Sequence, residues 1–131
     1  MAASMGCNVV AWEPVPNYAS FFKYALIRNH FLSKVQLRQR IVDDKGRGLK
    51  SITVPGSGHL RTAGVGGQTI PHAEYHNVTK LKAISEKIDQ VVKPQNILIM
   101  KIDVQGLESA VLKGSKVLLL DGNVQVRMLV T

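Results

Sequence analysis

The feature that most constrains the fold of this chain is a short apolar run that ends in an acid and a glycine. The run covers Ile97–Ile102 with one lysine in it, and Asp103 and Gly106 follow it. Because it is short and nearly continuous, it predicts a strand that is buried on both faces. Apolar residues then recur at helical spacing from Leu107, and Gly114 is the expected end of that helix. Strand, turn and helix make half of a parallel α/β unit, whose ligands bind at the carboxyl ends of the strands, and Asp103 stands at that end.

A second apolar run, near the start of the chain, also ends in an acid. Val9–Trp12 predicts a buried strand, and Glu13 and Pro14 follow it. Proline has no N–H for the hydrogen-bond ladder, so the strand ends there and Glu13 stands at its carboxyl end. A helix with Asn17 as its cap is expected next. We therefore expect Glu13 and Asp103 to lie on the same rim of one parallel sheet.

The remaining elements are predicted from hydrophobic spacing and turn residues. We expect a strand over 34–37, a turn over 43–46, a strand over 49–54, a helix over 80–92 and a last strand over 124–130. Residues 55–79 form a glycine-rich stretch with three of the four histidines, which predicts a surface loop. Their spacing matches neither the G-x-G-x-x-G nor the Walker phosphate-loop pattern. No metal site is predicted, because the histidines lack a metal-ligand spacing: His59, His72 and His76.

The composition limits the protein to a few broad classes. Its 131 residues suit one small domain, and 45% hydrophobic residues suit a packed core. No apolar run reaches the ~18–20 residues of a membrane span, and no secretory signal is visible, so the default compartment is the cytoplasm. The single cysteine, Cys7, excludes an internal disulfide.

The net charge of +8 is concentrated in one part of the chain. Seven of the 17 basic residues lie between Arg28 and Lys50, where only Asp43 and Asp44 oppose them. Such a cluster is typical of a surface that binds phosphates or nucleic acid. Aromatic residues do not interleave with these charges, so a solvated face or attraction to an anionic substrate is the competing interpretation.

Three segments, taken together, are similar to one known family. Residues 9–17 read V-V-A-W-E-P-V-P-N, and residues 101–108 read K-I-D-V-Q-G-L-E, with V-L-K-G-S at 111–115. They resemble the V-x-A-F-E-P-x-P-x-N and K-I-D-V-E-G-x-E-x-x-V-L-x-G-A segments of FkbM-type methyltransferases. Residues 40–46, R-I-V-D-D-K-G, are similar to the weaker A-L-S-D-K-x-G turn of that family.

The resemblance implies a fold and an activity. The implied fold is the Rossmann-like class I methyltransferase sheet, a doubly wound α/β arrangement of mostly parallel strands. The implied activity uses S-adenosylmethionine as cofactor and is usually O-methyl transfer, here to a small-molecule or glycan hydroxyl.

The resemblance also implies roles for three acids, each with a plainer alternative. Glu13 would accept hydrogen bonds from the ribose hydroxyls of the cofactor, or it is a solvent-exposed acid at a strand end. Asp43 would lie near the adenine and accept from its exocyclic amine, or it is a turn residue. Asp103 would face the methyl group and the substrate and orient or deprotonate a hydroxyl, or it caps the next helix. Glu108 is expected to support the turn rather than the chemistry.

The sequence departs from the family pattern in ways that bear on the fold. It contains neither the first strand nor the glycine-rich D-x-G-A-N-x-G loop of the family, and Gln105 stands where the family has glutamate. In the family topology the missing strand lies between the strands at 9–12 and 97–103, whose edges are then unpaired. We therefore expect 1–131 to be a single partial methyltransferase domain, an N-terminally incomplete member of the family. The expected consequences are weak stability and poor cofactor affinity, with self-association through the open sheet edges as one outcome.

Three functions are consistent with these observations. The first is a methyltransferase, whose activity in this chain alone stays open. The second is a non-catalytic Rossmann-like domain that binds a partner through its open edges, which oligomerisation without methyl transfer would favour. The third is a basic module that binds anions or nucleic acid, which a steep salt dependence of RNA or DNA binding would favour.

Overall fold

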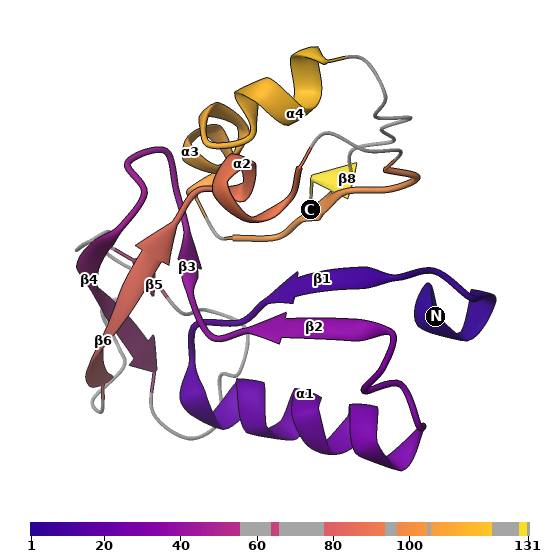
Figure 1. Ribbon diagram of the computed structural model, residues 1–131. Coiled ribbons are helices and arrows are strands. Elements are labelled where there is room, and N and C mark those ends of the chain that lie inside the picture. The colour runs from indigo at the N-terminus through magenta and orange to yellow at the C-terminus, as the bar shows by residue number, and fades with distance from the viewer. Residues whose placement is uncertain (56–63, 66–77, 94–96, 105, 122–128, 131) are drawn as a thin grey trace. The chain divides into compact units, whose positions relative to one another are not determined.

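The computed structural model describes residues 1–55, 64–65, 78–93, 97–104, 106–121 and 129–130. The chain divides into two compact units, Met1–Ile41 and Val42–Thr131. The described strands form three sheets, two of two strands and one of four (Figure 1). None of the helices in the described ranges has the length and apolar character that crossing a membrane requires.

The first unit contains a parallel β-α-β arrangement that agrees with the prediction. β1 (Val9–Trp12) pairs in parallel with β2 (Val35–Arg38), and α1 (Pro16–Arg28) connects them. Figure 1 shows α1 lying along this strand pair. Before them, the short 3-10 helix η1 (Ala3–Met5) ends at Gly6, whose φ of 89° is the left-handed conformation of a helix stop. The strands predicted at 9–12 and 34–37 are confirmed, and they pair in parallel.

Both ends of α1 carry residues that suit a helix terminus. Pro16 takes the first helical position, where its missing N–H costs nothing, so the helix begins earlier than predicted. At the other end the N–H of His30 donates to the Ile27 carbonyl at 3.1 Å, and the N–H of Phe31 donates to the Leu26 carbonyl at 2.9 Å. This pair of bonds is a Schellman motif, and His30 takes its left-handed position with a φ of 58°.

The second unit contains a four-stranded sheet in which β4 pairs antiparallel with both of its neighbours. β3 (Ile41–Val42), β4 (Gly48–Pro55), β5 (Gly64–Val65) and β6 (Val78–Glu86) lie in the order β3-β6-β4-β5. β4 and β6 pair along the whole of β4, from Gly48 opposite Ser85 to Pro55 opposite Val78. The strand predicted at 49–54 is confirmed.

The helix predicted over 80–92 is wrong for most of its length. β6 occupies residues up to Glu86, and only α2 (Ile88–Val91) is helical. Along β6 the half-buried Leu81 and Ala83 alternate with exposed lysines, which is the two-residue period of a strand. The apolar spacing also suits a helix, but continuous backbone pairing with β4 outweighs that local preference.

The last part of the chain contains a short parallel pair and two short helices. β7 (Lys101–Ile102) pairs in parallel with β8 (Leu129–Val130), and α3 (Glu108–Lys113) and α4 (Lys116–Leu120) lie between them in the sequence. The first of these helices ends at Gly114, as predicted.

The strand predicted over 97–102 is reduced to the two residues of β7. Leu98 and Ile99 are 58% and 61% exposed, whereas the predicted strand was expected to be buried on both of its faces. A strand of that kind needs a layer on each side and a neighbour on each edge, and β8 is the one strand that pairs with β7 in the described ranges.

The mixed α/β class is confirmed, but the described strands do not make one mostly parallel sheet. The described parallel pairs are β1–β2 and β7–β8, and in the largest sheet the described pairs, β4–β5 and β4–β6, are antiparallel.

The turn between β3 and β4 contains a buried, ionised carboxylate, that of Asp43. Asp43 is fully buried, and its Oδ1 accepts the N–H groups of Lys45 and Gly46, both at 3.0 Å. The ammonium of Lys50 pairs with Oδ2, and the Ser85 hydroxyl donates to the Gly46 carbonyl at 2.5 Å. Burial alone raises the pKa of Asp43, but the Lys50 ammonium, the two N–H groups and the Ser85 hydroxyl outweigh it and hold the pKa below its usual value. One carboxylate therefore fixes the turn between β3 and β4.

A glycine brings this turn against the helices. A Cβ at Gly114 would lie 2.1 Å from the carbonyl oxygen of Asp43, so the approach requires glycine, although the φ of Gly114 is an ordinary −72°. The Gly114 carbonyl accepts the N–H of Asp89 at 3.1 Å. The Asp89 carboxylate accepts the N–H groups of Val117 and Leu118, each at 3.0 Å, in the first turn of α4. These bonds tie the turn, α2 and α4 together.

Replacing Asp43 with asparagine leaves the Lys50 ammonium without its counter-charge. We expect this change to destabilise the protein by up to about 3 kcal/mol, because Lys50 is 27% exposed and water partly screens its charge. The pKa of Asp43 is lowered in the folded state, so its stabilisation is complete above about pH 4 and is lost as the pH falls through the folded-state pKa. Urea unfolding between pH 3 and pH 7 measures both effects. Asp44→Asn is the matched control and should change stability by less than about 0.5 kcal/mol.

Replacing Gly114 with alanine is expected to cost at least about 2 kcal/mol, because the new methyl group would overlap the backbone of Asp43. Gly48→Ala is the control within the same unit. Its Cβ would meet the Ser85 hydroxyl at 3.6 Å, an ordinary contact, so stability should change by less than about 1 kcal/mol. Equal urea midpoints for the two variants would contradict the close approach at Gly114.

Candidate functional site

Glu13 lies directly after β1, at the carboxyl end of a strand with a parallel partner. Its N–H donates to the Arg38 carbonyl at 3.1 Å, which extends the strand pairing by one residue. Its Oε1 accepts the N–H of Val15 at 2.9 Å, and no described residue donates to Oε2. Burial raises the pKa of the Glu13 carboxyl, and the Val15 N–H opposes that rise. A half-buried carboxylate with one oxygen available suits the recognition of a hydroxyl donor.

Asp103 follows β7, whose pairing with β8 is parallel, so it also stands at the carboxyl end of a strand. Its Oδ2 lies 3.2 Å from Nζ of Lys101, and both side chains are exposed. The N-cap residue of α3 is Leu107, so Asp103 does not occupy the N-cap position itself, and its role beside this helix stays a prediction. Lys101 and Asp103 are two residues apart, which puts them on the same side of an extended chain.

The turn after Asp103 is supported by residues within it. Gly106 has a φ of 90°, in the left-handed region that favours glycine. Its N–H donates to Oε1 of Glu108 at 3.0 Å. The expectation that Glu108 supports this turn is therefore confirmed.

Asp43 lies in the interior of its unit. Both of its carboxylate oxygens are engaged, one by two N–H groups and the other by the Lys50 ammonium. These contacts support the turn interpretation, and the contact with adenine stays a prediction.

The three predicted acids are distributed over two units. Glu13 belongs to the first unit and Asp43 and Asp103 belong to the second, so the shared rim of Glu13 and Asp103 stays a prediction. Within the second unit, α3 begins after the Asp103 turn and ends at Gly114, against the Asp43 backbone. α3 itself is roughly 9 Å long at about 1.5 Å per residue. The Asp43 backbone lies against the Gly114 end of this helix, and Asp103 precedes its other end by five residues in the sequence.

Two lysines that pair with these acids escaped the sequence prediction. The pairing of Lys101 with Asp103 could have been predicted from the sequence. A base two residues before an acid at a strand end lies on the same side of the chain as that acid. The pairing of Lys50 with Asp43 has no such sequence pattern, because Asp43 lies across a turn and the burial of its carboxylate depends on distant residues.

The described residues contain no group of three or more histidine, cysteine, aspartate or glutamate side chains that would suit a metal ion. His59, His72 and His76 lie outside the described residues, as does most of the glycine-rich stretch at 55–79.

Comparison with known protein families gives a match along almost the whole chain. Residues 2–130 match the family described as the Methyltransferase FkbM domain. Neither the curated proteins nor the solved structures give a match to this chain. The matched residues include both units and all three acids considered above. The chain therefore belongs to the FkbM methyltransferase domain family.

Proposed function

We propose that this protein is an S-adenosylmethionine-dependent methyltransferase that acts on a hydroxyl group of a small molecule or a glycan. The observation that carries the proposal is the family match over residues 2–130. The bound cofactor would supply an electrophilic methyl group, Glu13 would hold its ribose, and Asp103 would orient the acceptor hydroxyl or take its proton as the oxygen gains the methyl group. S-adenosylhomocysteine is the second product.

Within this proposal the two parallel strand pairs belong to a Rossmann-like class I methyltransferase sheet. The parallel pairing of β1 with β2 through α1, and that of β7 with β8, support this assignment. In such a sheet the ligand lies outside the carboxyl ends of the strands, which is where Glu13 and Asp103 follow β1 and β7.

Glu13 is proposed to accept hydrogen bonds from the ribose hydroxyls of the cofactor. The Val15 N–H holds one carboxylate oxygen at 2.9 Å, which restricts the direction of the other. A vicinal diol offers two donors, and an ionised carboxylate accepts both. Because burial raises the pKa of Glu13, its acceptor form is lost at a higher pH than that of an exposed glutamate.

Asp103 is proposed to orient the acceptor hydroxyl or to take its proton. Lys101 pairs with its carboxylate at 3.2 Å, and the Gly106 turn with its bond to Glu108 fixes the chain that follows. Methyl transfer depends mainly on alignment, because the sulfonium already makes the methyl group electrophilic.

Asp43 is proposed to act through the turn that it holds. Because its carboxylate is fully buried, direct contact with the adenine amine requires the turn to open. The bonds from Lys45 and Gly46 to Oδ1 fix the backbone of this turn, whose outer side is the part proposed to meet the adenine.

Replacing Glu13 with glutamine tests the cofactor assignment. The 131-residue chain contains no D-x-G-A-N-x-G loop, so we expect it to bind S-adenosylmethionine more weakly than the micromolar range. Glu13→Gln should weaken that binding by about tenfold further, the usual effect of losing a charged hydrogen-bond acceptor. Binding by the wild type should also fall as the pH drops toward the raised pKa of Glu13. Calorimetry with millimolar cofactor measures both effects.

Asp121→Asn is the matched control for this experiment, because it removes one negative charge from an exposed position. Its affinity should equal that of the wild type. Equal affinities of Glu13→Gln and the wild type would contradict the role of Glu13. Failure of the wild type to bind S-adenosylmethionine or S-adenosylhomocysteine at millimolar concentration would contradict the proposed cofactor and favour the non-catalytic alternative.

Replacing Asp103 with asparagine separates the two proposed sites. The variant should bind the cofactor within about twofold of the wild type, because Asp103 is assigned to the acceptor rather than to the ribose. Its rate of methyl transfer to hydroxyl acceptors should fall by about 100-fold or more if Asp103 takes the proton, and by less if it only orients the hydroxyl. Transfer of a tritiated methyl group measures the rate. A loss of cofactor affinity as large as that of Glu13→Gln would contradict this division of roles.

A further inference from the structure

One face of the β4–β6 pair is exposed and carries both apolar and basic side chains. Residues opposite each other in an antiparallel pair share a face, and three such pairs lie on this side: Leu49 with Ile84, Ser51 with Lys82 and Thr53 with Lys80. Leu49 and Ile84 are 66% and 44% exposed, and Val78, on the same side of β6, is 48% exposed. We call this surface, with the residues named here, the β4–β6 face.

The other side of the same strands packs into the protein. Ile52 and Val54 of β4 are buried there, and Lys50 on that side is paired with Asp43. The exposed aliphatic side chains of the β4–β6 face are therefore additional to the core.

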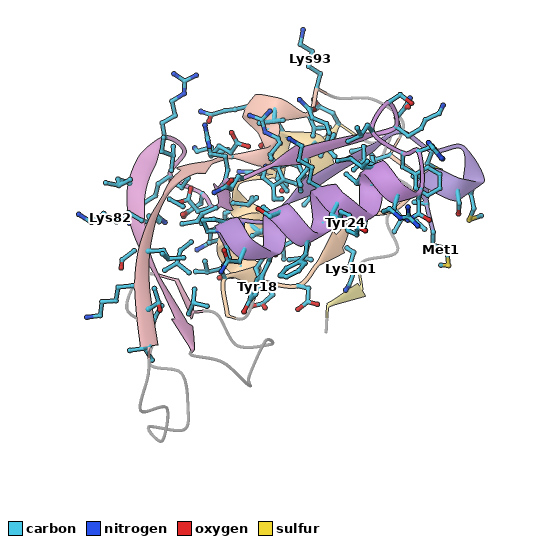
Figure 2. The ribbon with its side chains drawn as sticks, turned by 90° about the horizontal axis from the view of Figure 1, so that it is seen from below. Met1, Tyr18, Tyr24, Lys82, Lys93 and Lys101 are labelled. Carbon is cyan, nitrogen blue, oxygen red and sulfur yellow. The ribbon has the colours of Figure 1, made fainter. Side chains whose placement is uncertain are left out.

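The charge on this face has one sign. Lys80 and Lys82 are exposed, and so are Lys45 and Arg47 in the turn that leads into β4, where the half-buried Asp44 carries the opposite charge. β4 and β6 contain one acidic residue, Glu86, and its side chain is buried. Figure 2 shows the Lys82 side chain extending away from the sheet. In the described ranges, neither Lys80 nor Lys82 forms an ion pair.

The chemistry of the face discriminates among possible occupants. A second copy of the same face would bring its lysines against like charges. Single-stranded nucleic acids stack their bases on aromatic side chains, and the β4–β6 face has none. Protein interfaces are enriched in aromatic residues and arginine and depleted in lysine, which is the reverse of this composition. On this face the lysines lie between the aliphatic side chains at its two ends. This combination suits the surface of an anionic bilayer, where the apolar groups enter the interface and the ammonium groups meet lipid phosphates.

We propose that the β4–β6 face binds the surface of an anionic lipid bilayer and holds the domain there without crossing it. Leu49, Val78 and Ile84 enter the interfacial region. Lys80 and Lys82, together with the basic turn before β4, neutralise anionic headgroups. Each basic side chain near such a surface contributes measurably and is screened by salt, so the attachment is reversible and sensitive to ionic strength.

The test is co-sedimentation of the full 131-residue chain with vesicles. We expect binding to vesicles of phosphatidylcholine mixed with phosphatidylserine, and binding at least about tenfold weaker to phosphatidylcholine alone. Raising the salt from 0.05 M to 0.5 M should release most of the bound protein. Equal binding to both vesicle types, or none to either, would overturn the proposal.

Two double variants locate the surface. Lys80→Gln with Lys82→Gln should reduce the partition onto anionic vesicles by about tenfold or more. Lys113→Gln with Lys116→Gln removes the same charge from α3 and α4 and should leave binding within about twofold. Equal losses in the two double variants would mean that only total charge matters, which would contradict the proposed face.

A third double variant tests the apolar part. Leu49→Ser with Ile84→Ser alters an exposed cross-strand pair, so unfolding by urea should show a folded protein. This variant should lose most of the binding that remains at 0.5 M salt. If the chain instead binds RNA or an acidic polypeptide and ignores anionic vesicles, the occupant is not a bilayer and the proposal fails.

Discussion

The second unit depends on the buried carboxylate of Asp43. A fully buried charge is tolerated where other groups replace its water, and here two backbone N–H groups and the Lys50 ammonium do so. Lys50 belongs to β4, and Ser85, which bonds the same turn, belongs to β6. A shift of β4 by one residue would turn Lys50 to the opposite face and leave the carboxylate without its counter-charge. The turn and the register of the β4–β6 pair therefore require each other.

The same turn also fixes one end of α3. Gly114 ends that helix against the Asp43 backbone, and the Asp89 carboxylate holds the start of α4 beyond it. Because α3 is a short and rigid element, setting its end at Gly114 also sets where its start lies, directly after the Asp103 turn. The buried Asp43 turn thus fixes the helix that follows the Asp103 turn in the sequence.

The sequence predicted those elements whose limits are set by local chemistry. Pro14 ends β1 because proline has no N–H to donate, and Gly114 ends α3 where the chain approaches another backbone. The helix expected over residues 80–92 is wrong because strand pairing with β4, a non-local interaction, outweighs apolar spacing. The sequence likewise cannot decide whether Asp43 is a turn residue or a cofactor ligand. The burial of Asp43 depends on Lys50, Ser85 and Gly114, which come from three other elements. Glu13 was correctly placed at a strand end, since the apolar run and the proline after it are adjacent in sequence.

In the proposed enzyme the two site acids would have different electrostatic roles. The sulfonium loses its positive charge as the methyl group leaves, so a site with much negative charge would stabilise the cation before transfer and oppose the reaction. Lys101, at 3.2 Å from Asp103, offsets one negative charge at the proposed acceptor side, and the sequence has Gln105 where the family has glutamate. Glu13 is assigned to the ribose, where a partly desolvated carboxylate strengthens hydrogen bonds to neutral hydroxyls. In the proposed enzyme, negative charge would therefore serve cofactor recognition at Glu13, and Lys101 would balance it at Asp103.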